Sequence, residues 1–262
     1  MDDSNPLPIL PQLTVLVVDD NDVNRMYMLH LLRKSGHKPL AAADGGQALA
    51  LAASQAVDCI LMDVQLPDMD GLAVTRAIRD GQCTPANPPD VPILALTAFA
   101  LQGDRERCLA AGMDDHVAKP VRGRDLLLAM ARVIEGRAGR PAQPPQPAQS
   151  PAVLDLSEFS RKGNLEFAAE LLALFVELAE PKGRELAKAV QRGDVAAASG
   201  LAHDLAGMAG PLRAEALGQA MRALLAACQT GDAEACRQSH AQAETALAAV
   251  LAAARAHPLR NP

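Results

Sequence analysis

The sequence predicts two domains of different fold class, an α/β domain with a doubly wound parallel sheet and then an all-helical domain. From residue 13 to Arg137, short apolar runs alternate with helix-like segments, the pattern of a parallel sheet covered by helices on both faces. From Leu154 to His257, apolar residues recur at three- and four-residue spacing, which is typical of helices. Between them, residues 136–152 read GRAGRPAQPPQPAQSPA and have no apolar face to bury.

Length and composition agree with this division. A chain of 262 residues corresponds to about two domains of ordinary size, and 49% apolar residues suffice for a core in each. We expect the Pro-rich stretch to form an extended, semi-rigid linker. The predicted boundaries are an N-terminal tail 1–12, an α/β domain 13–136, a linker 137–153, a helical domain 154–258 and a C-terminal tail 259–262.

Five short apolar runs are the expected strands of the α/β domain. They are Leu13–Val18, Lys38–Ala43, Cys59–Met62, Pro92–Leu96 and His116–Ala118. Helical spacing predicts helices over Asp22–Lys34, which Gly36 ends, and over Gly46–Ser54, which follows the Asp44–Gly45 turn. The prolines within residues 80–90 exclude a helix or a central strand and predict a surface loop.

Polar residues stand where four of these strands end. Asp19 and Asp20 follow the first strand, and Asp63, Thr97 and Lys119 follow the third, fourth and fifth. Carboxyl ends of parallel strands meet at one edge of a sheet, so these side chains should share one crevice. Clustered carboxylates repel one another unless a cation lies among them. We therefore expect a divalent ion with oxygen ligands, Mg²⁺ or Mn²⁺.

This arrangement resembles the receiver domain of bacterial response regulators. The features that match are the adjacent acids, Asp63 followed by a Pro-x-x-Asp-Gly tail, a Thr97-Ala98 pair and a Lys119-Pro120 pair, all in the family's order. The resemblance extends from about Leu13 to Ile134 and implies a flavodoxin-like, five-stranded parallel domain.

The resemblance also implies a role for each acidic residue. Asp63 would accept a phosphoryl group. Asp20 and Asp63 would ligate the metal together with the backbone carbonyl of Gln65, and Asp19 would lie in the outer shell of the metal.

Three further residues have implied roles in phosphoryl binding and switching. Lys119 and Thr97 would hold phosphoryl oxygens. His116 stands three residues before Lys119, where receivers usually carry an aromatic side chain that moves when the Thr97 position engages phosphate. We favour His116 as this switch residue; the alternative is a partly exposed strand histidine.

The helical half carries apolar stripes of three-four spacing along each of its segments. Gly193–Asp194, Gly210–Pro211 and Gly231–Asp232 separate these segments. Short turns between amphipathic helices predict an antiparallel bundle of four main helices.

One histidine of this half stands apart from the core stripe. Leu201, Ala202 and Leu205 supply the stripe, which places His203 on the wetter side of its helix. Gly207, one turn further on, leaves room for another protein to approach the imidazole closely. The alternative is a solvated surface histidine beside a helix-loosening glycine.

Residues 155–256 resemble a histidine-containing phosphotransfer (Hpt) domain. The motif positions that fit are Ala202, His203, Leu205, Gly207 and Ala209. Two positions depart from the family, which has Lys where this chain has Ala206 and a later Gly where it has Arg213. Mg²⁺ and Lys119 on the receiver side already supply much of the charge stabilisation, so we predict that His203 remains a phosphoacceptor.

Charge and composition exclude several function classes. Residues 1–136 carry 18 acidic and 12 basic side chains, and residues 137–262 carry 13 of each. Without a basic face, and with only 2% aromatic residues, a nucleic-acid partner is not expected. The acidic start resembles no secretory signal, and the longest apolar run near the C-terminus, Ala246–Ala254, is too short to span a bilayer. We expect a cytoplasmic protein without membrane insertion.

The cysteines lack the spacing of a zinc site. They are Cys59, Cys83, Cys108, Cys228 and Cys236. We predict that all five are reduced and mostly buried.

The sequence thus predicts a two-component phosphorelay protein. A sensor histidine kinase would donate to Asp63, and His203 would exchange the phosphoryl group with Asp63 or with another receiver. No Gly-rich ATP-binding module is present, so we expect no kinase, and only the receiver's own phosphorylation and dephosphorylation. The start at Met1 favours a free-standing protein over the tail of a hybrid sensor.

Two alternatives remain open. In one, the helical domain docks a partner under the control of Asp63 phosphorylation while His203 is inert. In the other, the chain is a hydrolase with a phosphoaspartate intermediate, but such phosphatases carry Asp-x-Asp after the first strand, whereas Asp19 and Asp20 are adjacent.

Overall fold

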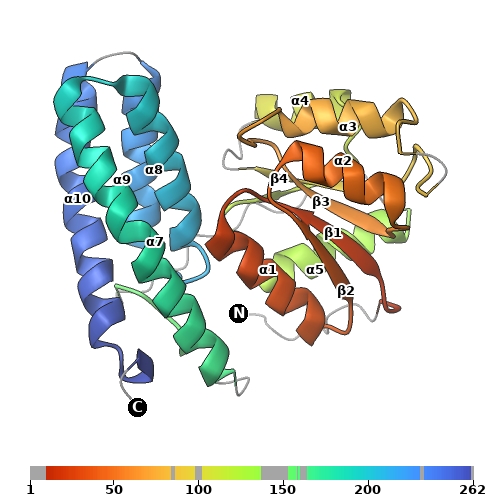
Figure 1. Ribbon diagram of the computed structural model, residues 1–262, viewed down its shortest axis with the longest axis horizontal. Coiled ribbons are helices and arrows are strands. Elements are labelled where there is room, and N and C mark those ends of the chain that lie inside the picture. The colour runs from red at the N-terminus through yellow and green to blue at the C-terminus, as the bar shows by residue number, and fades with distance from the viewer. Residues whose placement is uncertain are drawn as a thin grey trace. The chain divides into compact units, whose positions relative to one another are not determined.

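The computed structural model describes residues 10–83, 86–97, 102–136, 153–157, 159, 164–230 and 233–260. The chain divides into two compact units, residues 1–146 and residues 147–262, called here the α/β unit and the helical unit (Figure 1). Residues 1–9 of the predicted N-terminal tail and residues 137–152 of the predicted linker lie outside the described residues.

The α/β unit contains a five-stranded sheet that is parallel throughout. Its strands are β1 (Thr14–Val18), β2 (Lys38–Ala42), β3 (Cys59–Asp63), β4 (Ile93–Thr97) and β5 (Asp115–Ala118). The strand order is β2-β1-β3-β4-β5. All residues of β3 and β4 are buried, as expected for central strands covered on both faces. The predicted flavodoxin-like α/β class is confirmed.

Five helices cover this sheet. They are α1 (Asp22–Lys34), α2 (Gly45–Ser54), α3 (Gly71–Arg79), α4 (Gln102–Ala110) and α5 (Gly123–Ile134). Figure 1 shows α1 and α5 on one face and α2 and α3 on the other. Polar side chains cap three of them, because Asn21, Asp44 and Asp70 accept backbone N–H groups at the starts of α1, α2 and α3. The caps of α1 and α2 begin these helices shortly after β1 and β2 end, whereas Asp70 begins α3 at the end of the loop that follows β3.

Arg79, at the end of α3, joins this helix to the two segments that precede β4 and β5, at the amino-terminal edge of the sheet. Its guanidinium donates to the carbonyls of Pro89 (2.6 Å), Val91 (2.8 Å) and Gly112 (2.7 Å), and to the carboxylate of Asp114 (3.0 Å). The planar guanidinium group presents several donors in fixed geometry, so one side chain satisfies backbone groups that the loops leave unpaired.

The helical unit contains four helices along its described residues. They are α7 (Leu165–Arg192), α8 (Val195–Ala209), α9 (Glu215–Gln229) and α10 (Ala233–Ala256), and a short 3-10 helix, η1 (Pro258–Arg260), follows. α7 and α9 each contact both α8 and α10. The C-terminal half is therefore helical, as predicted. No described helix is long and apolar enough to cross a membrane.

Backbone conformation marks the turns of this unit. Gly193 ends α7 in the left-handed region at φ 69°, where a glycine is unstrained, and Asp194 then caps α8. Arg213, between α8 and α9, adopts φ 50°. Its guanidinium lies 3.5 Å from the carboxylate of Asp155, whose N–H donates to the carbonyl of Leu212 (2.9 Å). Arg213 thus adopts the left-handed backbone conformation that favours glycine while its side chain pairs with Asp155.

The cysteine prediction is wrong for one pair. A disulfide joins Cys228, near the end of α9, to Cys236, near the start of α10, with Cα atoms 5.1 Å apart. The turn between the two helices brings the two residues together, and their spacing in the sequence does not reveal it. Cys59, Cys83 and Cys108 form no disulfide and are buried, as predicted.

We predict that Arg79→Ala lowers the free energy of unfolding of the α/β unit by about 2–3 kcal/mol, because it leaves partly buried carbonyls without a donor. Calorimetric unfolding of the full chain measures the change. Arg76→Ala is the control, since Arg76 is an exposed residue of the same helix and its loss should change stability by less than about 0.5 kcal/mol. Equal losses of stability in the two variants would contradict the stabilising role of the Arg79 hydrogen bonds.

Candidate phosphoryl and metal site

The carboxyl ends of β1 and β3 bring three acids together. Asp63 is the last residue of β3 and is 2% exposed, while Asp19 directly follows β1 and is fully buried. Ligand atoms of Asp19, Asp20 and Asp63 all lie within 4.8 Å of one another. The parallel pairing of β1 with β3 causes this, because their chains leave the sheet at the same edge.

Lys119 enters this cluster from the end of β5. Its ammonium lies 3.1 Å from Asp19 and forms a second ion pair with Asp63, and its side chain is 8% exposed. The backbone N–H of Lys119 donates to the carbonyl of Thr97 (2.7 Å), which ties the ends of β5 and β4 together. The structure thus assembles the acids and the ammonium that the sequence places at separate strand ends.

Burial and charge perturb both members of the Asp63–Lys119 pair. Burial raises the pKa of Asp63 to about 7, with Asp19 acting in the same direction and Lys119 opposing it. Burial would lower the pKa of Lys119, but the carboxylates of Asp19 and Asp63 raise it above its usual value. The ammonium therefore stays protonated, and the cluster holds more acid than this one cation neutralises.

The donor set fits a hard divalent cation. Three carboxylates converge on one another with a single ammonium among them, so a second cation would relieve their repulsion. Carboxylate oxygens are the ligands that Mg²⁺ accepts. The acidic cluster of Asp19, Asp20 and Asp63 could therefore bind a metal ion. The Gln65 N–H donates to Asp63 (3.2 Å), which places Gln65 beside the cluster; its carbonyl as a ligand stays a prediction.

Thr97 ends β4 at the same edge of the sheet. Asp63 pairs with Leu96 across β3 and β4, so Thr97 is one residue beyond the strand partner of Asp63. Its side chain is largely buried, at 6% exposure. Ala98, the other member of the predicted Thr-Ala pair, lies outside the described residues. The contact of Thr97 with a phosphoryl oxygen stays a prediction.

His116 lies on β5 beside a buried ion pair that the sequence did not reveal. Its Nδ1 atom is 3.5 Å from Asp115, and Arg132 of α5 donates to Asp115 at 3.0 and 2.7 Å. Burial would raise the pKa of Asp115, but hydrogen bonds from His116 and Arg132 lower it overall. The imidazole is 19% exposed and so lies between core and solvent. Its role as a switch stays a prediction.

Asp68 and Gly71 hold the loop between β3 and α3 in place. Gly71 ends the Pro-x-x-Asp-Gly tail seen in the sequence, but the structural role of neither residue was predicted. Asp68 accepts the N–H groups of Gly45 and Gly46 at 2.9 Å each, which fastens the loop to the start of α2. These hydrogen bonds, the one from Gly45 first, lower the pKa of Asp68. A Cβ atom on Gly71 would lie 2.0 Å from the carbonyl oxygen of Asp63, so the start of α3 presses directly on the end of β3.

In the helical unit, His203 lies on α8 and is neither fully buried nor fully exposed. Ala202 and Leu205 are buried, as the predicted core stripe requires, whereas Leu201 is only partly buried. Asp204, the next residue along α8, forms an ion pair with Lys182 of α7. Sequence reasoning missed this pair because its members are far apart in the chain.

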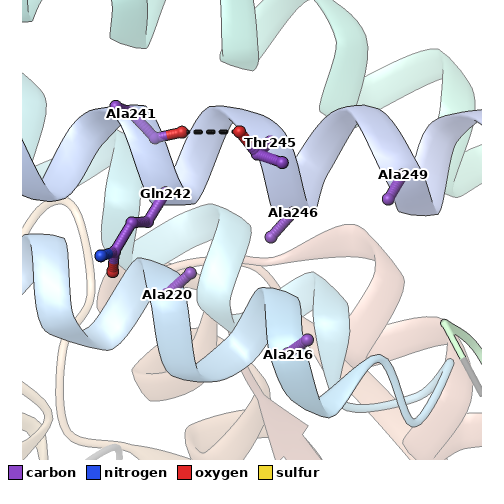
Figure 2. Close-up of a pocket in the computed structure, with 7 residues that line it drawn as sticks. All are labelled: Ala216, Ala220, Ala241, Gln242, Thr245, Ala246 and Ala249. Carbon is purple, nitrogen blue, oxygen red and sulfur yellow. Dashed lines mark hydrogen bonds between the residues drawn. The ribbon is translucent and has the colours of Figure 1, made fainter. Parts of the chain in front are cut away.

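A shallow depression lies elsewhere on the helical unit, between α9 and α10. Five alanines, Gln242 and Thr245 line it (Figure 2). The Thr245 hydroxyl donates to the carbonyl of Ala241 in its own helix (2.9 Å), as the dashed line in Figure 2 marks. Its lining holds no charged side chain, and no base contacts the Thr245 hydroxyl among the lining residues.

Comparison with known proteins identifies the relatives of the α/β unit. The family described as response regulator receiver domain matches residues 15–131. Polar-differentiation response regulator DivK of Brucella ovis is 36% identical over 108 residues, which cover 41% of this chain and 85% of DivK. The crystal structure of the receiver domain of sensor histidine kinase PA1611 from Pseudomonas aeruginosa PAO1, with a magnesium ion coordinated in its active site cleft, shares 44% identity. The match covers 48% of this chain and 99% of that one, at a TM-score of 0.43.

A longer match includes part of the helical unit. Sensor protein GacS of Pseudomonas syringae pv. syringae is 35% identical over 173 residues, which cover 62% of this chain. This share exceeds the part of the chain that residues 1–146 form, so the similarity extends beyond the α/β unit. The chain corresponds to only 18% of the length of GacS.

We predict that Gly71→Ala destabilises the α/β unit by about 3 kcal/mol, because the new methyl group collides with the backbone at Asp63. Gly46→Ala is the matched control: its Cβ atom would meet the nearest side-chain atom at 3.4 Å, an ordinary contact, and alanine favours a helix. Calorimetry should show a loss for Gly71→Ala and an unchanged or slightly higher stability for Gly46→Ala. A tolerated Gly71→Ala would contradict the close approach.

We also predict that Mg²⁺ stabilises the α/β unit, by about 1.4 kcal/mol when its concentration is tenfold above Kd. Asp20→Asn should remove most of this gain because it removes a ligand carboxylate. Asp22→Asn should leave the gain intact, since Asp22 pairs with Arg25 outside the cluster. Melting curves with and without Mg²⁺ measure the effect.

The Mg²⁺ effect should also depend on pH. The pKa of Asp63 is raised to about 7, so protons compete with the metal below that pH, and the Mg²⁺-induced shift should shrink from pH 8 to pH 6. A shift that is the same at both pH values, or that survives in Asp20→Asn, would place the metal elsewhere.

Proposed function

This chain belongs to the response regulator receiver family, and we propose on that premise that it is a phosphorelay protein in which Asp63 accepts a phosphoryl group and His203 relays one. The observation that carries the first role is the position of Asp63. It lies buried at the end of β3, in an ion pair with Lys119, and within 4.8 Å of Asp19 and Asp20. A reactive carboxylate, a fixed cation and a metal-binding cluster thus lie in one place.

The residues of the receiver would share the work of phosphoryl transfer. The Asp63 carboxylate would attack the phosphorus of the kinase's phosphohistidine, the P–N bond would break and the donor imidazole would leave, while the phosphoryl oxygens carry negative charge that must be neutralised. Lys119, already held beside Asp63, would exchange part of its contact with that carboxylate for a phosphoryl oxygen. Thr97 would donate its hydroxyl to a second oxygen. Bound Mg²⁺, held by Asp20, Asp63 and the Gln65 carbonyl with Asp19 behind them, would supply further positive charge.

The helical unit would form an antiparallel four-helix bundle of the Hpt type. Support comes from the mutual contacts of α7 to α10 and from the short turns at Gly193 and at Gly210. On this bundle, His203 lies opposite the buried Ala202–Leu205 side of α8, with Gly207 one turn away. A partner carrying an aspartyl phosphate could then reach the imidazole.

The partners follow from this chemistry. A sensor histidine kinase would phosphorylate Asp63, and either Asp63 or another receiver's aspartate would exchange the phosphoryl group with His203. The chain itself would be a phosphotransfer intermediate and no kinase.

A second function is favoured by the two departures from the Hpt motif. Ala206 removes a cation from the helix of His203, and Arg213 occupies a left-handed position with an ion pair to Asp155. In this alternative, the helical unit docks a partner when Asp63 is phosphorylated, and His203 is inert.

Labelling with radioactive acetyl phosphate and Mg²⁺ distinguishes the two functions. We expect label on the native chain to depend on Asp63, so that Asp63→Asn removes all of it. His203→Gln should retain only base-labile label on Asp63, whereas the native chain should also show acid-labile, base-stable label on His203. His240→Gln, which changes a histidine of α10, is the control and should behave like the native chain.

Either of two results would decide against part of this function. Label that persists in Asp63→Asn without relocation to histidine would refute Asp63 as the acceptor. Absence of base-stable label on the native chain, with normal Asp63 labelling, would favour the docking module.

A further inference from the structure

We propose that Lys182 of α7 supplies the cation for a phosphoryl group on His203, and that Asp204 pairs with Lys182 only while His203 is unmodified. This role rests on the proposed function of His203. The observation behind it is the ion pair that joins Lys182 to Asp204, the residue that follows His203 in α8. Consecutive Cα atoms are about 3.8 Å apart, but neighbouring side chains of a helix point in different directions, so the flexible Lys182 side chain would turn from Asp204 to meet a group bound to His203.

Helix α8 carries no cation of its own. Its sequence, VAAASGLAHDLAGMA, contains neither Lys nor Arg. Phosphoryl transfer depends on positive charge near the phosphoryl oxygens. A cation for His203 must therefore come from a neighbouring helix or from the partner protein, and α7 and α9 are the helices that contact α8.

The basic residue of α9 points to the wrong end of α8. The Arg222 side chain extends back along α9 toward Gly218. A Cβ atom built on Gly218 would lie 3.2 Å from the Arg222 guanidinium. Gly218 itself packs against Ala209, at the C-terminal end of α8. Lys182, by contrast, reaches α8 at Asp204.

The local sequence of α7 explains how Lys182 is presented. Lys182 stands between Pro181 and Gly183, two residues that weaken a helix interior. A Cβ atom on Gly183 would lie 2.6 Å from a methyl group of Leu247, so α10 approaches α7 closely at this residue. The Lys182 side chain extends to α8 instead. The middle of α7 thus combines close packing on α10 with a cation directed at α8.

The partial exposure of the pair suits an exchange of partners. The side chain of Lys182 is 33% exposed and that of Asp204 is 25% exposed, so a ligand can reach the ammonium without unfolding the helices. A phosphoryl group carries nearly two negative charges at neutral pH, more than the single charge of Asp204. The ammonium would therefore turn from the carboxylate to the phosphoryl group once His203 is modified.

Phosphoramidate is a small donor that can phosphorylate His203 directly. A ring nitrogen of neutral His203 attacks the phosphorus of phosphoramidate, the P–N bond of the donor breaks, and ammonia leaves with a proton from solvent. The other ring nitrogen of His203 releases its proton to solvent. Lys182 changes only its ionic partner in this step, so no oxidant or further reactant is needed.

The test uses the full chain with Asp63→Asn, so that phosphoramidate labels histidine independently of the receiver. Mass spectrometry follows label on His203 over time, with His240 as the internal reference for unassisted reaction. We expect Lys182→Met to slow labelling of His203 about tenfold and Lys182→Arg to restore most of it. Asp204→Asn should have the opposite sign and speed labelling, because it removes the carboxylate that competes with the phosphoryl group for Lys182. Lys188→Met, which breaks an exposed pair with Glu185 in the same helix, is the control and should change nothing.

The outcomes separate the inference from the function on which it rests. If His203 is labelled no faster than His240 in the starting chain, the relay function of His203 fails. If His203 is labelled faster but Lys182→Met does not slow it, only the role of Lys182 is refuted. A purely structural ion pair would make Lys182→Met and Asp204→Asn equally slow, with equal drops in melting temperature, and that result would also overturn the role.

Discussion

The α/β unit depends on one electrostatic constraint: the ammonium of Lys119 sits buried between two buried carboxylates, Asp19 and Asp63. Parallel strands that end at a common edge force these groups together, and the low polarity of the surroundings strengthens every interaction among them. A single positive charge leaves an excess of negative charge in the cluster, and burial together with the nearby Asp19 keeps the pKa of Asp63 high despite the Lys119 ammonium. The same excess is what a divalent cation bound among the three carboxylates could neutralise.

The loop that follows Asp63 fixes the position of the Asp63 backbone. Gly71 lets the start of α3 touch the backbone of Asp63, and Asp68 fastens the loop to α2. The site is therefore braced by two helices on the same face of the sheet. The hydrogen bond from the Lys119 N–H to the Thr97 carbonyl fixes the ends of β5 and β4 relative to each other. The positions of the clustered side chains thus depend on α2, α3 and the ends of several strands together.

The sequence predicted most of this arrangement, because strand ends and polar residues coincide along the chain. Asp19, Asp63, Thr97 and Lys119 each follow an apolar run, and parallel topology alone then brings them together. Sequence reasoning missed the interactions between side chains distant in the chain. Arg79, Asp68 and Asp115 look like ordinary surface charges until the fold shows which backbone groups or partners they meet. The disulfide was missed for a similar reason, since only the α9–α10 turn shows that Cys228 faces Cys236.

That disulfide closes residues 228–236 into a covalent ring at the tip of the helical unit. A protease that cuts the chain within this ring cannot release its C-terminal helix, because both fragments stay joined through sulfur. Cleavage there would pass unnoticed on a denaturing gel until a reductant is added. The α9–α10 hairpin therefore tolerates a break in its backbone that the α7–α8 and α8–α9 turns, which lie outside the ring, would not.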